Sequence, residues 1–331
     1  MLRFPFATEA HAPRKACLSQ RSTRTVPDRG HGCAARAAQS RARRVKAPVA
    51  PERFQLLRPL GRGSLGAVYA AHDHLLKRIV ALKLVALGAG RATADRELAQ
   101  ARFRAETQAA RRLVHPDIVV TLDSGCDDES GWLVMELVPG TALSRYTAMP
   151  RLLPESKALG VAERLAAALA YAHGAGVLHR DVKPANVLVD WRTDSVKLAD
   201  FGTAHVVGGE STRTGVWMGT PAYLAPEVLA GEAPSAQSDL YALCVTLFQM
   251  LCGKLPHEGA SLGQWLRIIT QEPAPELSSL RPDLPAEWGA LLRRLLARRP
   301  KERPGDGLAL AAELRALRPP HSAAPGAAGA A

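Results

Sequence analysis

The chain has 331 residues, of which 47% are apolar and 22% are charged. This is enough apolar sequence for one large domain or for two lobes with cores of their own. The net charge of +12 is unevenly distributed, because residues 1–50 carry 11 Lys and Arg against Glu9 and Asp28, so the remaining 281 residues carry only +3. A nearly neutral globular part does not indicate a basic groove, and we expect no nucleic-acid partner for it.

Residues 1–52 are rich in Arg, Ala and Ser and are interrupted by Pro and Gly. They lack apolar periodicity, which predicts a basic, disordered N-terminal tail. The simplest interpretation is a solvated tail or an assigned start that lies too far upstream. An arm for an anionic partner and an organelle transit peptide are the alternatives.

The five cysteines are scattered and form no CxxC pair, which favours neither a disulfide framework nor a zinc site. A reducing compartment suits them best. No apolar run is long enough to cross a bilayer, and no signal-peptide core follows Met1. We therefore expect a cytoplasmic protein without a membrane span.

Short β-branched or alternating runs dominate the first half of the globular part and predict strands at 53–61, 66–73, 78–85, 117–125 and 131–137. A long helix is expected from about 93 to 113. Its residues near one face are Leu98, Arg102, Ala105, Ala109 and Leu113. Five strands and one helix make a small lobe, at about 53–138.

Helical patterns dominate the second half, at about 155–176, 236–253, 261–271, 286–297 and 306–317, and several follow Ser, Pro or Asp start signals. They predict a larger, mainly helical lobe at about 139–317 and an α+β fold class. Residues 318–331 are of low complexity and are expected to form a disordered tail. There is no internal repeat.

The segment GRGSLGAVY places Gly61, Gly63 and Gly66 at GxGxxG spacing. Dinucleotide-binding folds use the same spacing, but there the glycines open a helix. Here residues 67–70 continue as a strand, which favours a hairpin that covers phosphates, with glycines that let the backbone approach the ligand. An ordinary Gly-rich hairpin is the alternative.

Lys83 lies in an apolar strand, in the segment VALK. A buried ammonium group needs an anion, and Glu106 in the predicted helix is the nearest candidate. The alternative is that Glu106 pairs with Arg102 on an exposed helix face. Such a pair contributes only about 0.3–0.5 kcal/mol and leaves Lys83 unexplained, so we predict a Lys83–Glu106 ion pair.

The segment HRDVKPANVLV is more specific, because it puts His179, Arg180, Asp181, Lys183 and Asn186 into one polar loop that leads into a strand. A carboxylate, a cation and an amide oxygen at this spacing can meet a hydroxyl nucleophile, a phosphoryl group and a metal ion together. The segment LADFG then adds Asp200 at the end of another strand, as a second oxygen ligand for Mg²⁺.

From about Phe54 to Leu317 the order of these segments resembles the protein kinases, in particular the eukaryotic-like Ser/Thr kinases of bacteria. The resemblance rests on the Gly-rich loop, VALK, the helix glutamate, HRD, DFG and APE. It implies a bilobal protein-kinase fold for 53–317, with a five-stranded antiparallel small lobe, and transfer of the ATP γ-phosphoryl group to Ser or Thr of protein substrates.

The resemblance also implies roles at individual positions. Asp181 accepts or orients the substrate hydroxyl proton, Lys183 neutralises the transferred phosphoryl group, and Asn186 and Asp200 hold Mg²⁺, with Mn²⁺ as an alternative. Lys83, held by Glu106, contacts the α- and β-phosphates beneath the three glycines. The residues implied around the adenine are Leu60, Val68, Ala81, Met135 as gatekeeper, the backbone of Glu136 and Val138, and Leu188.

Two anchors and one departure complete the resemblance. Asp239 resembles the helix-start residue that braces the HRD backbone, and Glu227 with Arg303 resembles the ion pair of the large lobe. Cys244 stands where many relatives have Gly, a change that we expect to affect helix packing rather than chemistry.

The segment GESTRTGVWMGTPAYLAPE resembles an activation loop. Thr220 is implied in substrate docking, while Thr212 and Thr214 are predicted autophosphorylation sites, modified in trans within a transient homodimer. Arg180 and His205 are the expected phosphate-receiving residues. The alternative is a solvated loop whose threonines have no regulatory role.

Two rival functions use the same fold. A pseudokinase scaffold would bind nucleotide without phosphoryl transfer, but all the key residues are present. A small-molecule phosphotransferase usually lacks the APE segment and the peptide-docking loop found here. We therefore favour an active Ser/Thr protein kinase, whose substrate and activating signal are not readable from the sequence.

Overall fold

The computed structural model describes residues 50–63, 66–87, 93–201 and 221–318. The chain divides into two units, 1–43 and 44–331. The first unit lies outside the described residues, and the fold below is that of the second. The predicted tails, 1–52 and 318–331, also lie outside them except for residues 50–52 and Arg318.

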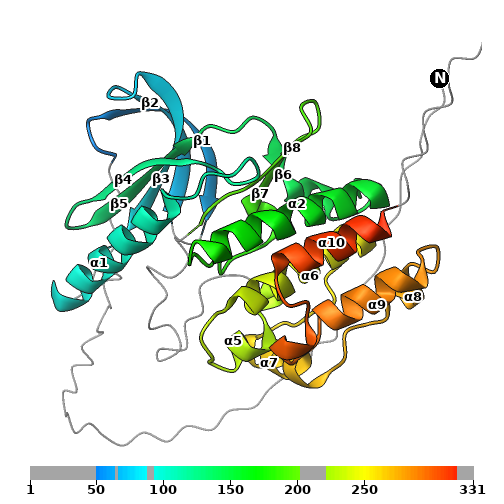
Figure 1. Ribbon diagram of the computed structural model, residues 1–331. Helices are drawn as coiled ribbons and strands as arrows, with labels where there is room; N and C mark the ends of the chain where they lie inside the picture. The colour runs from blue at the N-terminus through cyan, green and yellow to red at the C-terminus, as the bar shows by residue number, and fades with distance from the viewer. Residues whose placement is uncertain (1–49, 64–65, 88–92, 202–220, 319–331) are drawn as a thin grey trace, which may run out of the picture. The chain divides into compact units, whose positions relative to one another are not determined.

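A five-stranded sheet forms the small lobe, and each strand is antiparallel to its neighbours in the order β1-β2-β3-β5-β4 (Figure 1). Its strands are β1 (Phe54–Gly63), β2 (Gly66–Asp73), β3 (Arg78–Ala86), β4 (Thr121–Cys126) and β5 (Ser130–Glu136). Val80, Leu82 and Leu84 of the central β3 are buried together with Val134 of β5. The predicted five-stranded antiparallel sheet is therefore confirmed.

The fourth strand begins four residues later than predicted. The backbone of the preceding segment bonds to β8 (Ser195–Leu198) instead, because Val119 N–H donates to the Leu198 carbonyl at 2.9 Å and Leu198 N–H donates to the Asp117 carbonyl at 2.8 Å. The segment between the helix and β4 thus joins the small sheet to the rest of the fold.

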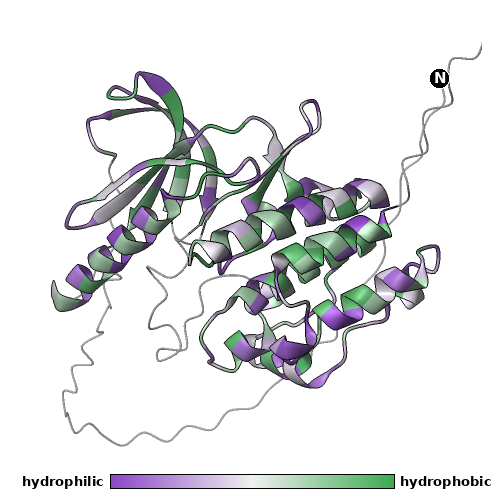
Figure 2. Ribbon diagram, viewed as in Figure 1, coloured by the Kyte–Doolittle hydropathy of each residue, from purple (hydrophilic) through white to green (hydrophobic). Residues whose placement is uncertain are grey.

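The long helix of the small lobe is α1 (Thr93–Ala110). Its buried residues are Ala99, Phe103, Thr107 and Ala110, whereas Leu98 on the predicted face is 46% exposed. The predicted face is therefore only partly buried, because Leu98 and Ala105 are exposed while Leu113, beyond the end of α1, is buried. Phe103 packs against Val85 and Leu87, and this sets the rotation of the helix. Figure 2 shows hydrophilic and apolar residues alternating along α1, as expected for a helix with one solvent face.

The large lobe is mainly helical, as predicted. Its helices are α2 (Glu155–Gly174), α5 (Pro226–Leu229), α6 (Ala236–Cys252), α7 (Leu262–Gln271), α8 (Leu277–Leu280), α9 (Ala286–Leu295) and α10 (Gly307–Leu317). Helix α6 is buried along nearly its whole length and contacts α2 and α9. Helix α10 lies on α2, and its first residue must be Gly307, because a Cβ there would come within 2.4 Å of the Ala166 carbonyl oxygen.

A small sheet in the order β6-β7-β8 lies beside α2, with β6 (Thr141–Ala142) and β7 (Val187–Asp190). The polar 179–186 loop ends in the short 3₁₀ helix η2 (Pro184–Asn186) and leads directly into β7. Asp200 follows β8 by two residues. The turn between β7 and β8 therefore brings the two polar segments to the same end of the sheet.

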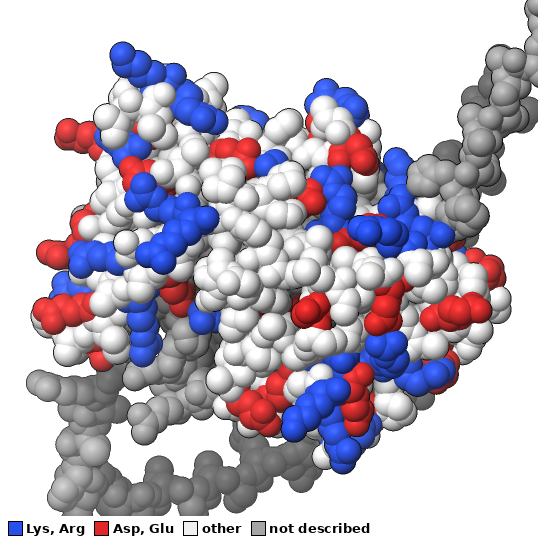
Figure 3. Space-filling model, viewed as in Figure 1, with Lys and Arg blue, Asp and Glu red and all other residues white. Residues whose placement is uncertain are grey.

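Within the described ranges, we find no helix that is both long enough and apolar enough to span a bilayer. On the face drawn in Figure 3, Lys and Arg are interspersed with Asp and Glu. Opposite charges therefore neighbour one another on that face.

Candidate active site

The glycines of the predicted phosphate hairpin differ in what surrounds them. Gly63 and Gly66 pair across the β1–β2 turn, whose residues 64 and 65 lie outside the described ranges. A Cβ on Gly66 would come within 1.8 Å of the Leu84 carbonyl oxygen, whereas a Cβ on Gly61 would meet nothing within 4 Å. Gly66 is thus required by the neighbouring strand β3, whereas Gly61 borders open space.

Most of the predicted adenine-site residues lie in one apolar cluster. Ala81 and Met135 are buried there, and Val68, Val138 and Leu188 are partly buried against them. These residues come from β2, β3, β5, the segment after β5 and β7. Leu60 of β1 is 38% exposed. Elements of both lobes therefore supply one apolar wall, and part of this wall is exposed to solvent.

The ion pairs at the centre of the site differ from the predicted one. Lys83 Nζ lies 2.8 Å from Asp200 Oδ1, and Arg180 Nη1 lies 2.8 Å from Glu106 Oε1. The second oxygen of Glu106, Oε2, is buried without a hydrogen-bond partner. The prediction that Glu106 holds Lys83 is therefore corrected, since each residue has taken another partner of opposite charge from the large lobe.

Burial raises the pKa of Glu106 above its usual value, and the nearby Arg180 guanidinium opposes this rise. The carboxylate is thus held in a place that penalises its charge.

The 179–186 loop brings its three predicted functional groups together. Lys183 Nζ lies 2.9 and 2.8 Å from the two carboxylate oxygens of Asp181. Asn186 Nδ2 donates to the Asp181 backbone carbonyl at 2.8 Å and to its Oδ2 at 2.9 Å. The side chain of Asp181 is 35% exposed, so a carboxylate with fixed orientation faces solvent beside a cation.

Asp239 at the start of α6 holds the backbone of this loop, as predicted. Its carboxylate accepts the N–H groups of His179 at 2.8 Å and Arg180 at 2.7 Å, and lies 2.9 Å from His173 Nε2. Arg180 has a φ of 66°, a left-handed conformation that costs free energy in a residue other than glycine. The buried carboxylate offsets this strain and sets the position of Asp181.

The Asp200 segment is tied to the loop through backbone and ring contacts. Ala199 N–H donates to the Asn186 carbonyl at 2.8 Å, and His179 Nε2 lies 2.8 Å from the Ala199 carbonyl oxygen. Phe201 is buried, with its ring 4.6 Å from the His179 ring. Asp200 itself has a φ of 69°. The two predicted metal ligands, Asn186 and Asp200, are therefore held in neighbouring segments.

The second predicted anchor is also present. Arg303 Nη1 and Nη2 each lie 2.7 Å from a carboxylate oxygen of Glu227, and both side chains are buried. Cys244 is fully buried on α6, with its Sγ 3.8 Å from the Leu292 carbonyl oxygen. This hydrogen bond joins α6 to helix α9.

Tyr223 lies close enough to this loop for its hydroxyl to be affected by the charge of Asp181, and no role is predicted for it from the sequence. Its hydroxyl donates to Gln249 Oε1 at 2.6 Å. Burial raises the pKa of Tyr223 to about 12, and the negative charge of Asp181 adds to the rise. The other predicted residues of the activation loop, namely His205, Thr212, Thr214 and Thr220, lie outside the described residues.

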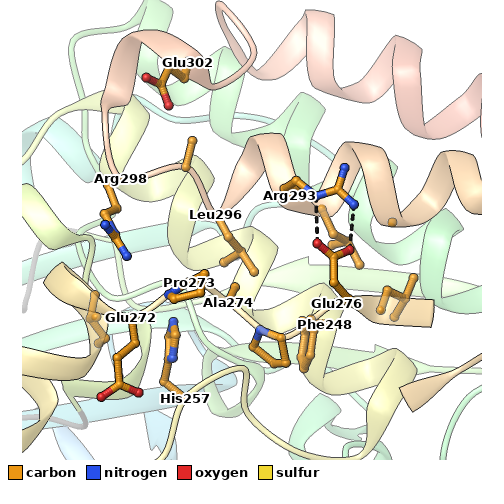
Figure 4. Close-up of a pocket in the computed structure, with 16 residues that line it drawn as sticks. Phe248, His257, Glu272, Pro273, Ala274, Glu276, Arg293, Leu296, Arg298 and Glu302 are labelled. Atoms are coloured by element: carbon orange, nitrogen blue, oxygen red, sulfur yellow. Dashed lines mark hydrogen bonds and ion pairs between the residues drawn. The ribbon is translucent and has the colours of Figure 1, made fainter. Parts of the chain in front are cut away.

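A cavity of about 370 Å³ opens elsewhere in the large lobe (Figure 4). It is lined by parts of α6, α7 and α9 and by the segment before α8, and Glu276 pairs with Arg293 at its edge at 2.6 Å. It contains no residue of the 179–186 loop. The nucleotide site is therefore not assigned to this cavity.

Comparisons of the sequence and of the fold with known proteins point to the same family. Residues 54–315 match the family described as protein kinase domain. The Ser/Thr protein kinase pkn3 of Myxococcus xanthus is 36% identical over 270 residues, which cover 78% of this chain and 48% of the relative. PrkC of Bacillus subtilis is 34% identical over 252 residues, which cover 76% of this chain and 38% of the relative. The chain thus spans less than half the length of these two relatives.

Two solved structures have a similar fold. The Mycobacterium tuberculosis PknI kinase domain has a TM-score of 0.65 at 31% identity, over 82% of this chain and 98% of that one. Rad53 residues 1–466, in complex with AMP-PNP, has a TM-score of 0.64 at 25% identity, over 80% of this chain and 64% of that one.

Proposed function

Because this chain belongs to the protein kinase family, we propose that it is an active Ser/Thr protein kinase that transfers the ATP γ-phosphoryl group to protein hydroxyls. The observation that carries the proposal is the joint placement of Asp181, Lys183 and Asn186 in one hydrogen-bonded loop. A scaffold that only binds nucleotide would not need this arrangement beside Asp200.

ATP binding is supported by the apolar wall around Ala81 and Met135 and by the open space at Gly61. The adenine would lie between Val68 and Ala81 on one side and Leu188 on the other. Lys83 is largely buried, with a 7% exposed side chain, and would donate to the α- and β-phosphates. Rad53, which has a similar fold, is known in complex with AMP-PNP.

A divalent cation fits the residues present. Asn186 uses its amide nitrogen on Asp181, so its carbonyl oxygen is the atom suited to a metal, and Asp200 adds a carboxylate that now accepts from Lys83. Among the described residues no group of three or more His, Cys, Asp and Glu could hold a metal ion. Two protein oxygens suit Mg²⁺, which takes its other ligands from phosphates and water, and Mn²⁺ is an alternative. Bound Mg²⁺ would neutralise phosphate charge.

In the transfer step, the substrate hydroxyl oxygen forms a bond to the γ-phosphorus while the bond to the β–γ bridging oxygen breaks. Asp181, partly exposed and oriented by Asn186, would accept the hydroxyl proton. Lys183 would stabilise the negative charge on the transferred group. ADP leaves with the bridging oxygen, so atoms and charge balance.

We further propose that the ion pairs of the structure represent a resting state that activation-loop phosphorylation releases. A phosphate on Thr212 or Thr214 would bind Arg180, with His205 as a second contact, and would compete with Glu106 for this guanidinium. Glu106 could then pair with Lys83, which would leave Asp200 to the metal. Modification in trans would require a transient homodimer.

Protein substrates are the proposed partners, and no nucleic acid is expected for the kinase domain. The cytoplasm is the proposed location, because the cysteines show no disulfide spacing.

The experiment compares the purified chain with its Asp181→Asn variant in Mg-ATP and a basic protein substrate, with phosphosites mapped by mass spectrometry. We expect phosphoserine and phosphothreonine only with the wild type. Equal background in both, even after forced dimerisation or addition of acidic lipid, would favour the nucleotide-binding scaffold.

A further inference from the structure

An ion pair outside the proposed catalytic loop joins the end of β5 to β8, the strand that leads to Asp200. Glu136 is the last residue of β5, and its Oε1 lies 2.8 Å from Lys197 Nζ of β8. The same oxygen accepts the Val120 N–H at 2.9 Å. The side chains of Glu136 and Lys197 are 23% and 19% exposed, so both charges are mostly removed from solvent.

Residues 117–120 lie between these two strands and bond to both. On one side, Glu136 N–H donates to the Val120 carbonyl at 3.0 Å. On the other, Val119 N–H donates to the Leu198 carbonyl at 2.9 Å, and Lys197 Nζ lies 3.4 Å from the Ile118 carbonyl oxygen. We call residues 117–120 with Glu136, Lys197 and Leu198 the junction.

The junction touches both halves of the nucleotide site. Val119 belongs to the same apolar cluster as Met135, the proposed gatekeeper, and Glu136 is the residue whose backbone is proposed to meet the adenine. Lys197 lies three residues before Asp200, and its neighbour Leu198 is fully buried. A shift of the β5 end relative to β8 would therefore move the adenine contacts relative to the metal ligand.

A role in stability alone does not account for the geometry as well. The 117–120 segment already has an anchor in the large lobe, because Asp117 is paired with Arg164 of α2. The Glu136–Lys197 pair adds a bond at the end of β5, where this strand leaves the small lobe. Because both side chains are mostly removed from solvent, breaking this pair also lowers stability, but the pair in addition fixes the relative position of two strands.

We propose that Glu136 and Lys197 are positioning residues that hold the end of β5 to β8 and thereby set the affinity for the nucleoside triphosphate. This inference rests on the proposed kinase function. Neither side chain needs to touch the nucleotide, because Glu136 acts through its backbone and Lys197 through Glu136 and the Ile118 carbonyl.

The test measures Mg-ADP affinity by calorimetry, together with KM for ATP, KM for the protein substrate and kcat, in Lys197→Met, Glu136→Gln and the double variant. Methionine keeps the length of the side chain and removes the ammonium. We expect Lys197→Met to weaken Mg-ADP binding and raise KM for ATP by about three- to ten-fold, while kcat and KM for the protein substrate stay within about two-fold.

The double variant should bind Mg-ADP about as weakly as Lys197→Met alone, because both substitutions break the same pair. Lys197→Arg, which can still pair with Glu136, should restore affinity to within about two-fold of the wild type. If Lys197→Met does not fold, Glu136→Gln is compared with Lys197→Arg. Mg-ADP affinity should fall in Glu136→Gln and should be kept in Lys197→Arg.

Arg281→Met is the matched control. Arg281 is 21% exposed and pairs with Glu155 of α2 at 2.5 Å, away from the 179–186 loop, so its loss should lower the melting temperature and leave Mg-ADP affinity unchanged. The proposal is overturned when Lys197→Met behaves like Arg281→Met, or when the effects of the two junction substitutions simply add. Because Mg-ADP binding needs no phosphoryl transfer, a chain that binds normally but does not transfer phosphate counts against the kinase function alone.

Discussion

The bond network of Asp239 allows a worked prediction for Asp239→Asn. The carboxylate is 2% exposed and accepts backbone N–H groups from His179 and Arg180 through different oxygens, at 2.8 and 2.7 Å. Asparagine has one oxygen, so one N–H must face an amide group. Hydrogen bonds to a charged acceptor contribute about 1.5–3 kcal/mol each, so losing one and weakening the other should cost about 3–5 kcal/mol of unfolding free energy.

The functional effect should exceed what destabilisation alone explains, because the strained Arg180 backbone positions Asp181. A displacement of this kind predicts a fall in kcat of about 10- to 100-fold in the folded variant. Urea unfolding and steady-state kinetics measure the two effects. Asp306→Asn is the control: Asp306 accepts the Ala309 N–H at 2.8 Å at the exposed start of α10, and asparagine caps helices about as well, so the change should stay within about 0.5 kcal/mol. Asp239→Asn within about 1 kcal/mol of the wild type, at full kcat, would refute the reasoning.

Three further predictions concern buried charges and thiols. Arg303→Met should lower the unfolding free energy by about 3–5 kcal/mol in urea titrations, because it leaves the Glu227 carboxylate buried and unpaired; a loss below about 1 kcal/mol would contradict this. Burial raises the pKa of Glu106 in the folded chain above its value in the unfolded chain. The folded chain therefore gains stability from protonation of Glu106 below about pH 4.5, and this gain is lost as the pH rises through the pKa of the folded chain. Glu106→Gln should therefore gain stability relative to the wild type as pH rises from about 4.5 to 7, and a difference that is constant with pH would be inconsistent. Burial raises the pKa of the partly buried Cys252 to about 11 and that of the fully buried Cys244 well above its usual value, so both thiols should react slowly with an aromatic disulfide at pH about 8 until urea is added; a fast reaction of Cys244 in the folded chain would argue against its burial.

Local pattern was sufficient for most of the fold. Alternating β-branched runs and helical periodicity identified the strands and helices, and the order of short polar segments identified the site. The braces Asp239 and Glu227–Arg303 were also predictable from the resemblance. In each case a buried carboxylate meets the donors that lie nearest to it, the backbone N–H groups of the loop for Asp239 and the Arg303 guanidinium for Glu227.

The ion pairs around Lys83 could not be predicted in the same way. Glu106 has two candidate cations, Lys83 and Arg180, and the residue types alone do not decide between them. Local sequence does not specify how far Glu106 of α1 lies from each of these cations. The structure has Lys83 with Asp200 and Glu106 with Arg180.

The buried face of α1 and the reason for Gly66 were missed for packing reasons. Alanine occurs on several sides of α1, so its pattern is ambiguous, and the position of Phe103 against Val85 and Leu87 decides which side is buried. The requirement for Gly66 comes from the carbonyl of Leu84 on the neighbouring strand. Both depend on the distance between elements, which local sequence does not specify.

The most direct test of the account is a time course of phosphatase-treated chain in Mg-ATP, with phosphate on Thr212 and Thr214 and phosphate on a protein substrate quantified together. The account predicts that loop phosphate appears first, at a rate per molecule that rises with enzyme concentration, and that substrate phosphorylation then accelerates several-fold. Asp181→Asn should show neither. Substrate phosphorylation at full rate from the start, by a chain without phosphate on either threonine, would contradict the proposed exchange at Arg180, and equal phosphate in the wild type and Asp181→Asn would contradict the kinase function itself.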